Sequence, residues 1–484
     1  MNYPPVDALR MNRRRWLAHS GLGLATTLGA SSIANLLLGT RPAYAADYKA
    51  LLCIFLYGGN DGLNTVVPTD AARYNQYAGV RNQLALPRNS LVPLSGMSYG
   101  LHPALAGLKT AADDARIAPV FNVGPLIKPL TKAEFRAASA NSGVLPDSLF
   151  SHSDQQYLWE NGTGDSHEPT GWGGRASETL ATVNPVITLS GTPRFGISHL
   201  HTPLVLPGTP GDTFGAFEMQ PDDLTIPWKA ERKAAVDALY SETQDLQLAN
   251  AYATIQRDAF SVSGRLNGLL KIVPGGAGAL PAIDTAFAPL ISGGNFSTAL
   301  SRQLYQIAKL VAGNATVQGN RQIFFAQVGG FDTHGNQAES GSPTEGVHAR
   351  QLKEVGDALG AFYGAMKALG LGEAVTAFTQ SDFGRTFLPN NSMGTDHAWG
   401  NNHLVVGGAV KGGRGYGTYP ELVLGGPNDV GVDTWEQQGR WIPTTSVDQY
   451  ASTLLGWFGA SDVQLHTVLP NLVNFGAATR LGFV

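Results

Sequence analysis

Short apolar runs, separated by polar and glycine-rich stretches, recur along this chain. The run from Ala50 to Leu56, ALLCIFL, is continuously apolar and is followed at once by the polar sequence YGGNDG. A short run of this kind, bounded by glycines, is typical of a strand buried on both faces of a parallel sheet. Similar runs predict further strands at 117–123, 186–189, 323–328, 374–379 and 404–406.

Between several of these runs, apolar residues recur every three to four positions. This spacing predicts helices at 103–115, 227–260 and 345–368. Alternating strands and helices indicate an α/β fold, here a doubly wound, mostly parallel sheet in an α/β/α sandwich. Ligands bind such sheets at the edge where the strands end. The polar segments that follow the strands are therefore where we look for chemistry.

The first 45 residues carry a different pattern. The sequence RRRWL at 13–17 contains the arginine pair that the twin-arginine export machinery recognises. A weakly apolar run at 22–38 and the small-x-small sequence AYA at 43–45 follow, as in a cleaved signal peptide. A membrane anchor is the alternative, but a spanning helix needs about 20 strongly apolar residues, and Ser31, Ser32 and Asn35 interrupt this run.

We therefore expect residues 1–45 to be a twin-arginine signal peptide and residues 46–484 to form a single domain with loop insertions. The mature protein would be periplasmic or secreted, without a stable membrane span after cleavage, since no later stretch is long and apolar enough. The chain has a single cysteine, Cys53, which excludes an internal disulfide. Folding in the reducing cytoplasm before export would account for this.

The charge balance narrows the class of partner. The chain has 33 Lys and Arg against 37 Asp and Glu, and no dense basic run follows the leader. This balance speaks against nucleic acid as a partner. A small molecule or a neutral polymer fits the composition better.

Three polar motifs follow or precede predicted strands between 329 and 403. They read GGFDTHG at 329–335, QSDFGR at 380–385 and GTDHAWGNNH at 394–403, and a further aspartate follows the first strand. In an extended segment, residues i and i+2 point to one side, so Asp332 and His334 would bind one cation together. The candidate metal ligands are Asp61, Asp332, His334, Asp382, Asp396, His397 and His403.

A mixture of aspartate and histidine suits zinc, manganese or iron better than calcium. Two such ions about 4 Å apart would polarise a phosphoryl-type oxygen and activate an attacking hydroxyl or water. Arg385 would add a bidentate hold on the same oxyanion. The alternative is that these aspartates cap ordinary turns, a reading that weighs most for Asp61 in its glycine loop.

A second alternative is a metal-independent serine hydrolase. The sequence GMSYG at 96–100 has the G-x-S-x-G form of a nucleophile elbow, with Ser98 as the nucleophile. The preceding segment contains Pro93 and makes a poor central strand. No C-x-P-x-R, Walker, Rossmann or H-E-x-x-H motif is present.

Taken together, the motifs resemble the bacterial family called domain of unknown function 1501. This twin-arginine-exported group is placed in the alkaline phosphatase and sulfatase-like superfamily. The resemblance implies that superfamily's α/β/α fold, with metal at the carboxyl edge of the sheet. It rests on LYGGNDGLNTVVP (56–68), LHPALAGL (101–108), SHSDQQYLWENG (151–162), TGWGGR (170–175), GGFDTHGNQ (329–337), SDFGRT (381–386), GTDHAWGNNHLVVGGAVKGGRGYG (394–417) and GRWIPTTSVDQYASTLLGWFG (439–459).

The resemblance also implies roles for individual residues. Asp61 corresponds to the ligand after the first strand, and Asp332 with His334 to the pair after a middle strand. The sequence SDFG at 381–384 resembles the superfamily's S-D-H-G with phenylalanine in place of histidine. One ligand is thus displaced, and Asp396, His397 and His403 are the residues that would supply it.

For the nucleophile, the nearest candidates are Ser151 and the adjacent His152. The expected function is an exported metal-dependent hydrolase of phosphate or sulfate esters that acts on a small anionic ester. Arg385 would steady the oxyanion, and Ser151 or a water activated by the metal would attack. The alternative is a non-catalytic exported protein that binds a metal or another ligand on the same fold.

Overall fold

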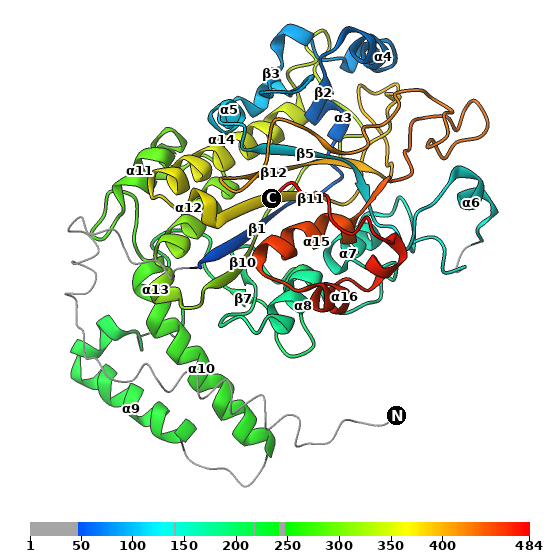
Figure 1. Cartoon of the computed structure of the whole chain (residues 1–484). Coiled ribbons are helices and arrows are strands. Elements are labelled where there is room, and N and C mark those ends of the chain that lie inside the picture. The colour runs from blue at the N-terminus through cyan, green and yellow to red at the C-terminus, as the bar shows by residue number, and fades with distance from the viewer. Residues whose placement is uncertain (1–46, 140–141, 217, 242–246) are drawn as a thin grey trace. The chain divides into compact units, whose positions relative to one another are not determined.

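The computed structural model describes residues 47–139, 142–216, 218–241 and 247–484 (Figure 1). The predicted signal peptide at 1–45 lies outside these ranges. The described residues belong to one compact unit. In the described ranges, no helix combines the length and the apolar character that crossing a membrane requires.

A nine-stranded mixed sheet forms the centre of this unit. The strand order is β13-β5-β12-β11-β1-β10-β6-β7, and β14 pairs with β5. All neighbouring pairs are parallel except the two that involve β12. The predicted α/β fold with a mostly parallel sheet is confirmed. The strands are β1 (Lys49–Leu56), β5 (Ile117–Gly124), β6 (Ile187–Thr188), β7 (Leu204–Val205), β10 (Arg321–Val328), β11 (Val375–Ser381), β12 (Asn401–Gly407), β13 (Tyr416–Gly417) and β14 (Thr445–Ser446).

The reversed direction of β12 decides which of its residues reach the functional edge. Strands β1, β10 and β11 are parallel and end together at Leu56, Val328 and Ser381. Because β12 runs antiparallel to β11, it is the beginning of β12, at Asn401, that lies at this edge. The loop just before β12 therefore meets the loops that follow the three parallel strands.

Helices cover both faces of the sheet, as the alternating side chains of β1 require. Leu52, Ile54 and Leu56 belong to one buried cluster, and Leu51, Cys53 and Phe55 belong to the other. Figure 1 shows the sheet between α14 and α15. The first face is covered by η3 (Pro103–Leu108), α5 (Lys109–Asp113), α11 (Pro281–Phe287), α12 (Ala299–Ala312) and α14 (Val347–Ala368), and the second by α7 (His152–Asn161), α8 (Trp172–Thr179), α15 (Val447–Phe458) and α16 (Asp462–Val468).

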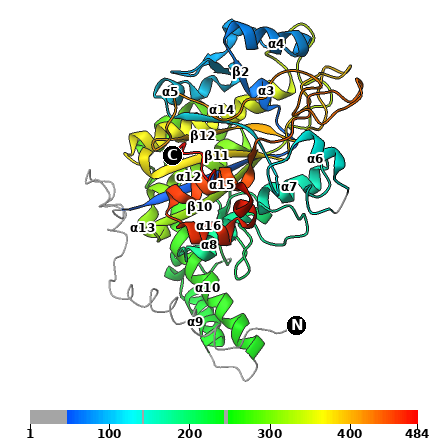
Figure 2. The same cartoon turned by 45° about the vertical axis from the view of Figure 1, so that its right-hand side comes forward.

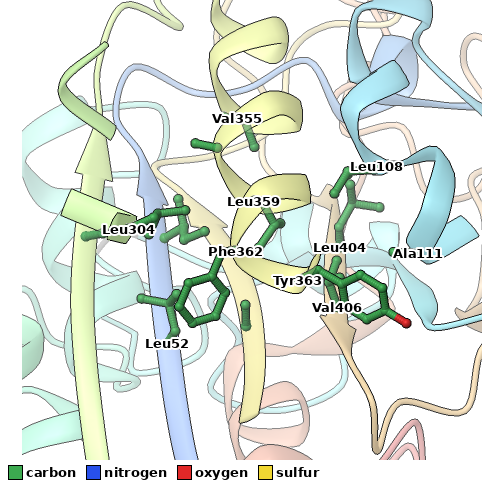
Figure 3. Close-up of a cluster of buried hydrophobic side chains, with 14 of the residues drawn as sticks. Leu52, Leu108, Ala111, Leu304, Val355, Leu359, Phe362, Tyr363, Leu404 and Val406 are labelled. Atoms are coloured by element: carbon green, nitrogen blue, oxygen red, sulfur yellow. The ribbon is translucent and has the colours of Figure 1, made fainter. Parts of the chain in front are cut away.

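The packing of α14 illustrates how the first face is formed. Apolar residues recur at helical spacing along α14, and Val355, Leu359 and Phe362 are all buried. Figure 3 shows Phe362 beside Leu52 of β1, and Tyr363 beside Leu404 and Val406 of β12. Burying such side chains contributes roughly 1.5–3 kcal/mol each, which holds the strands whose ends carry the polar loops.

The remaining elements lie outside these two layers. The predicted helix at 227–260 is present as two helices, α9 and α10, which lie side by side (Figure 2). A small sheet of β2, β4 and β3 and the hairpin of β8 and β9 complete the fold. The helices and strands of this remaining part are α3 (Gly62–Thr65), α4 (Ala71–Arg81), α6 (Lys132–Ala137), α9 (Pro227–Ser241), α10 (Gln247–Leu270), α13 (Asn314–Val317), β2 (Val66–Pro68), β3 (Val92–Pro93), β4 (Tyr99–Leu101), β8 (Ile291–Ser292) and β9 (Asn295–Phe296).

Candidate metal centre

Polar side chains from three segments meet at the carboxyl edge of the sheet. Asp332 and His334 follow β10, and His397 precedes β12. His152 is the first residue of α7, a helix that packs against β11. These four residues, which we call the His3Asp cluster, lie far apart in the sequence and close together in space.

The ligand atoms of His152, Asp332 and His397 all lie within 4.8 Å of one another, which allows these three residues to share one ion, and His334 lies beside Asp332 and His397. Asp332 Oδ1 lies 3.2 Å from His334 Nε2 and 3.5 Å from His397 Nε2. Asp332 Oδ2 lies 3.4 Å from His152 Nε2, and the Nε2 atoms of His334 and His397 are 2.8 Å apart. Four ligands at 2.0–2.2 Å from a tetrahedral ion would be about 3.3–3.6 Å apart. The observed distances come close to this range.

The other ring nitrogen of each histidine is engaged by the protein. Nδ1 of His152 donates to Asp382 Oδ2 at 2.7 Å, and Nδ1 of His397 donates to the Phe150 carbonyl at 2.7 Å. Nδ1 of His334 lies 2.8 Å from Asp396 Oδ1. Each acceptor is a carboxylate or a carbonyl, so each Nδ1 carries a proton, and Nε2 is the nitrogen that a neutral ring would offer to a metal. Carboxylates and carbonyls hold metal-binding histidines in this same way.

The fit to a cation also rests on one orphaned atom. His152 Nε2 is buried and has no hydrogen-bond partner in the described part of the chain. A buried polar nitrogen without a partner is costly. One cation between His152, Asp332 and His397 would give His152 Nε2 a partner.

Neighbouring charges keep Asp332 ionised, and the pKa values of His152 and His397 are shifted in opposite directions. Burial opposes ionisation of Asp332, but Arg385, His152 and His334 outweigh it, and its pKa is lowered. The hydrogen bond to Asp382 raises the pKa of His152. Burial lowers the pKa of His397, which favours the neutral imidazole that binds metal.

Asp382 and Arg385, which follow β11, support the cluster from behind. Besides His152, the buried carboxylate of Asp382 accepts from the backbone N–H of Gly58 at 3.0 Å and from Gln156 Nε2 at 2.8 Å. We predicted Asp382 as a metal ligand. In the structure its oxygens are occupied by these donors, and it orients His152.

Arg385 is also placed differently from our prediction. We expected it to contact an oxyanion, but its side chain is 0% exposed. It donates to Asp332 Oδ1 at 2.6 Å and to the backbone carbonyls of Gly59 and Thr395 at 2.8 Å and 3.1 Å. Its position thus fixes Asp332 and leaves it little capacity for a substrate.

The close approach of β1 to this site depends on Gly58. Its φ is 115°, a backbone region that residues with a side chain rarely adopt. A Cβ at this position would lie 2.4 Å from the backbone nitrogen of Asp332. Only glycine therefore lets the loop after β1 contact the loop after β10.

Asp61 is separated from the cluster by its own ion pair. Its carboxylate is fully buried, caps α3 and lies 2.7 Å from Arg81 Nη2. Gln337 Nε2 donates to its second oxygen at 2.6 Å. Burial opposes ionisation of Asp61, but Arg81, His348 and the hydrogen bonds prevail and its pKa is lowered. In this structure the aspartate after the first strand faces an arginine where the resemblance implied a metal.

His403 is likewise placed away from the cluster. It is the third residue of β12, and its ring points into the buried cluster on the α15 side, edge-on to Trp159 at 4.7 Å. Nδ1 lies 3.3 Å from Thr379 Oγ1. Burial lowers its pKa to about 3, so the ring is neutral. The residue that reaches the site from this motif is His397, because it precedes the strand.

The predicted nucleophiles differ in their surroundings. Ser151 is the N-cap residue of α7, and its Oγ lies 3.2 Å from Ser153 Oγ. His152, predicted beside it as a catalytic group, belongs to the His3Asp cluster. Ser98 lies in the exposed turn between β3 and β4, which are antiparallel. The nucleophile elbow requires a turn from a strand to a helix, so Ser98 does not lie in a nucleophile elbow.

Sequence reasoning did not anticipate His152 as a ligand or Phe150 as the acceptor for His397. The signal that was available is the sequence SHS at the start of a helix, within a motif of the resemblance. Phe150 contributes through its backbone carbonyl, and its φ of 73° is unusual for an aromatic residue. A carbonyl contact of this kind leaves no trace in residue type.

The fold and the site define an α/β protein with a candidate metal centre at the carboxyl edge of its sheet. Residues 232–429 match the sequence model of a family described as "Protein of unknown function (DUF1501)". The match confirms the family resemblance over these residues, which include Asp332, His334 and His397 but not His152. A search of curated proteins finds no match.

Proposed function

We propose that this protein is an exported, metal-dependent hydrolase of phosphate or sulfate esters with an alkaline phosphatase-like fold. His152, Asp332, His334 and His397 would hold one divalent ion. The observation that carries the proposal is the convergence of three Nε2 atoms on one carboxylate, with each Nδ1 engaged by the protein.

The donor set indicates which ions fit. Three imidazoles and one carboxylate suit zinc, manganese or iron, and they contain too much nitrogen for a dedicated calcium or magnesium site. A divalent ion held there would supply Lewis acidity, which polarises an ester oxygen and lowers the pKa of water. The protein's own contribution is to fix the ligands and, at His397, to favour the neutral imidazole.

Exposure indicates the side from which a substrate would approach. The side chains of Asp332 and His334 are 47% and 48% exposed, whereas Asp382 and Arg385 are 0% exposed. A small anionic ester would therefore reach the cluster from the side of Asp332 and His334. Ser151, which directly precedes His152 and is partly exposed, is our candidate for an attacking side chain besides water.

Export is part of the proposal because of the leader. The twin-arginine sequence at 13–17 is expected to direct the folded chain to the export machinery, and the mature protein would act in the periplasm or outside the cell. A protein exported in its folded state acquires its metal in the cytoplasm, where the cluster would be loaded before translocation.

The first test is elemental analysis of protein purified after export. We expect about one equivalent of a transition metal in the native protein and its loss in Asp332→Asn and His397→Gln. Asp113→Asn, a change at an exposed aspartate paired with Lys109, is the matched control and should keep the metal. Native protein without stoichiometric metal, or variants that retain it, would overturn the metal centre.

The second test is a panel of phosphatase, sulfatase and phosphodiesterase substrates. We expect turnover of at least one ester class by the metal-loaded protein and none by Asp332→Asn. A protein that binds metal stoichiometrically and turns over none of these esters would be the non-catalytic binding protein of the alternative hypothesis.

A further inference from the structure

We propose that Arg440 is the residue that binds the anionic part of the substrate at the His3Asp cluster. This inference rests on the proposed function and names a tetrahedral oxyanion, phosphate or sulfate, as the group recognised. Arg440 lies in the loop between β13 and β14 and follows the matched residues 232–429.

Two arginines, Arg385 and Arg440, contact residues of the cluster, and they differ in how many of their N–H groups are already hydrogen-bonded within the protein. Arg385 is buried, and its nitrogens donate to Asp332 and to backbone carbonyls. Arg440 is partly exposed, and its Nε donates to the carbonyl of His397 at 2.8 Å. In the described ranges, neither Nη of Arg440 has a hydrogen-bond or ion-pair partner. Its fork of donors is therefore the one available to a ligand.

Hydrogen bonds from four backbone N–H groups to one buried carboxylate order the loop that carries Arg440. The buried carboxylate of Asp429 accepts from the backbone N–H groups of Gly425, Gly431, Gly439 and Arg440, at 2.9–3.3 Å. The Arg440 carbonyl accepts from Val430 N at 3.0 Å. A loop organised in this way presents its arginine with little loss of freedom on binding.

The guanidinium also contacts the element that orients His397. It lies 5.6 Å from the centre of the Phe150 ring, within cation–π range. The carbonyl of Phe150 accepts the Nδ1 proton of His397, and the carbonyl of His397 accepts from Arg440. Arg440 thus contacts the backbone of His397 and also the side chain of Phe150, whose carbonyl orients the His397 ring.

The charge balance of the site calls for such a cation. Asp332, Asp382 and Asp396 supply three negative charges and Arg385 one positive charge, so a divalent ion leaves the centre neutral when the imidazoles are neutral. Arg440 gives the loaded centre a net positive charge. An arginine is suited to this task because two of its N–H groups fit the oxygens of phosphate or sulfate together.

The test measures binding of an anion, independently of turnover. Inorganic phosphate and, separately, sulfate are titrated calorimetrically into zinc-loaded native protein, Arg440→Met, Arg440→Lys and Arg414→Met. Arg414 is exposed and stacks on Tyr416, which makes it the matched control. We expect phosphate affinity to fall about 10- to 100-fold in Arg440→Met, less in Arg440→Lys, and not at all in Arg414→Met. Because Arg440 also contacts the backbone of His397, zinc content is measured for each variant and affinities are compared per zinc-loaded molecule.

Equal phosphate affinity in native protein and Arg440→Met overturns the inference, as does absence of phosphate and sulfate binding by zinc-loaded native protein. If Arg440→Met unfolds, Arg440→Lys decides, because it keeps the charge and loses the paired geometry. Failure of the metal centre is seen separately, as absence of zinc from native protein. Anion binding that requires Arg440 in a protein without esterase activity would uphold the inference and refute the hydrolase.

Discussion

Nδ1 of His152 donates to the carboxylate of Asp382 at 2.7 Å, across 230 positions of sequence. The contact joins the first residue of α7 to the residue that follows β11. It directs the lone pair of His152 Nε2 toward Asp332, where the other two imidazoles of the cluster also point. An aspartate predicted as a ligand thus acts through a histidine that was predicted as a catalytic group.

Replacing Asp382 by asparagine should weaken metal binding without unfolding the protein. Asparagine lacks the charge that makes His152 more basic, and its amide can present an N–H to Nδ1, which would move the ring proton to Nε2. We expect metal affinity to fall about 10- to 100-fold, measured by competition with a chromogenic chelator. Asp396→Asn should act in the same direction through His334, and unchanged affinity in both variants would contradict this role.

The Asp61–Arg81 pair should matter for stability and not for metal. Asp61→Asn leaves the buried guanidinium of Arg81 without its counter-charge, which typically costs about 3–5 kcal/mol. Urea unfolding is expected to show this loss in the free energy of unfolding, while elemental analysis of the folded variant shows native metal content. Asp332→Asn should give the reverse pattern. A folded Asp61→Asn protein that has lost its metal would restore Asp61 as a ligand.

His403 should contribute to acid sensitivity as a buried neutral histidine. Burial lowers its pKa to about 3 in the folded state, below the value of about 6.5 for an exposed histidine. The unfolded chain therefore binds one more proton, and the free energy of unfolding falls as the pH drops from about 6.5 toward 3. The expected slope is about 1.4 kcal/mol per pH unit for this group.

His403→Phe should reduce that slope by about 1.4 kcal/mol per pH unit, the contribution of one proton, and the variant should keep the metal. The measurement is urea unfolding at several pH values between 6.5 and 4, with metal analysis in parallel. An unchanged slope would show that His403 does not stay neutral in the fold, and loss of metal would return it to the ligand set.

Asp448 should produce the opposite pH dependence. Burial raises its pKa to about 8, from 3.8 for an ordinary aspartate, although Arg175 lowers it in part. The folded state then binds the proton more tightly than the unfolded state between these values, so stability declines as the pH rises from about 4 to about 8. Asp448→Asn, which cannot ionise, should unfold at a higher temperature than native protein at pH 8.5. This gain should shrink at pH 5, and an equal gain at both pH values would rule out ionisation as its cause.

The strands of the sheet could be predicted from the sequence because the pattern that indicates a buried strand is local. Each buried strand is a short apolar run bounded by glycine or polar residues, and all six predicted runs form strands. The helix at 345–368 was equally clear, since its apolar residues recur at helical spacing and form α14. The predicted helix at 103–115 has the right position, but its first turns are a 3-10 helix, η3.

The direction of β12 could not be predicted from the sequence, and this direction determines which histidine belongs to the site. An apolar run has the same pattern in either direction, so the sequence treats His397 and His403 as equivalent members of one motif. The antiparallel placement of β12 brings His397 to the edge and turns His403 into the core. Strand direction follows from how distant segments pack, and no local signal records it.

The sequence by itself determined an α/β protein with aspartates and histidines beside the ends of its strands, because apolar periodicity and turn composition are local properties of the chain. Only the tertiary structure decided which of those side chains share one point in space. Asp61 faces Arg81, Asp382 faces His152, and His152 joins Asp332. Each of these pairings depends on contacts between segments that are distant in sequence, and such contacts are formed by packing of the whole sheet and its helices.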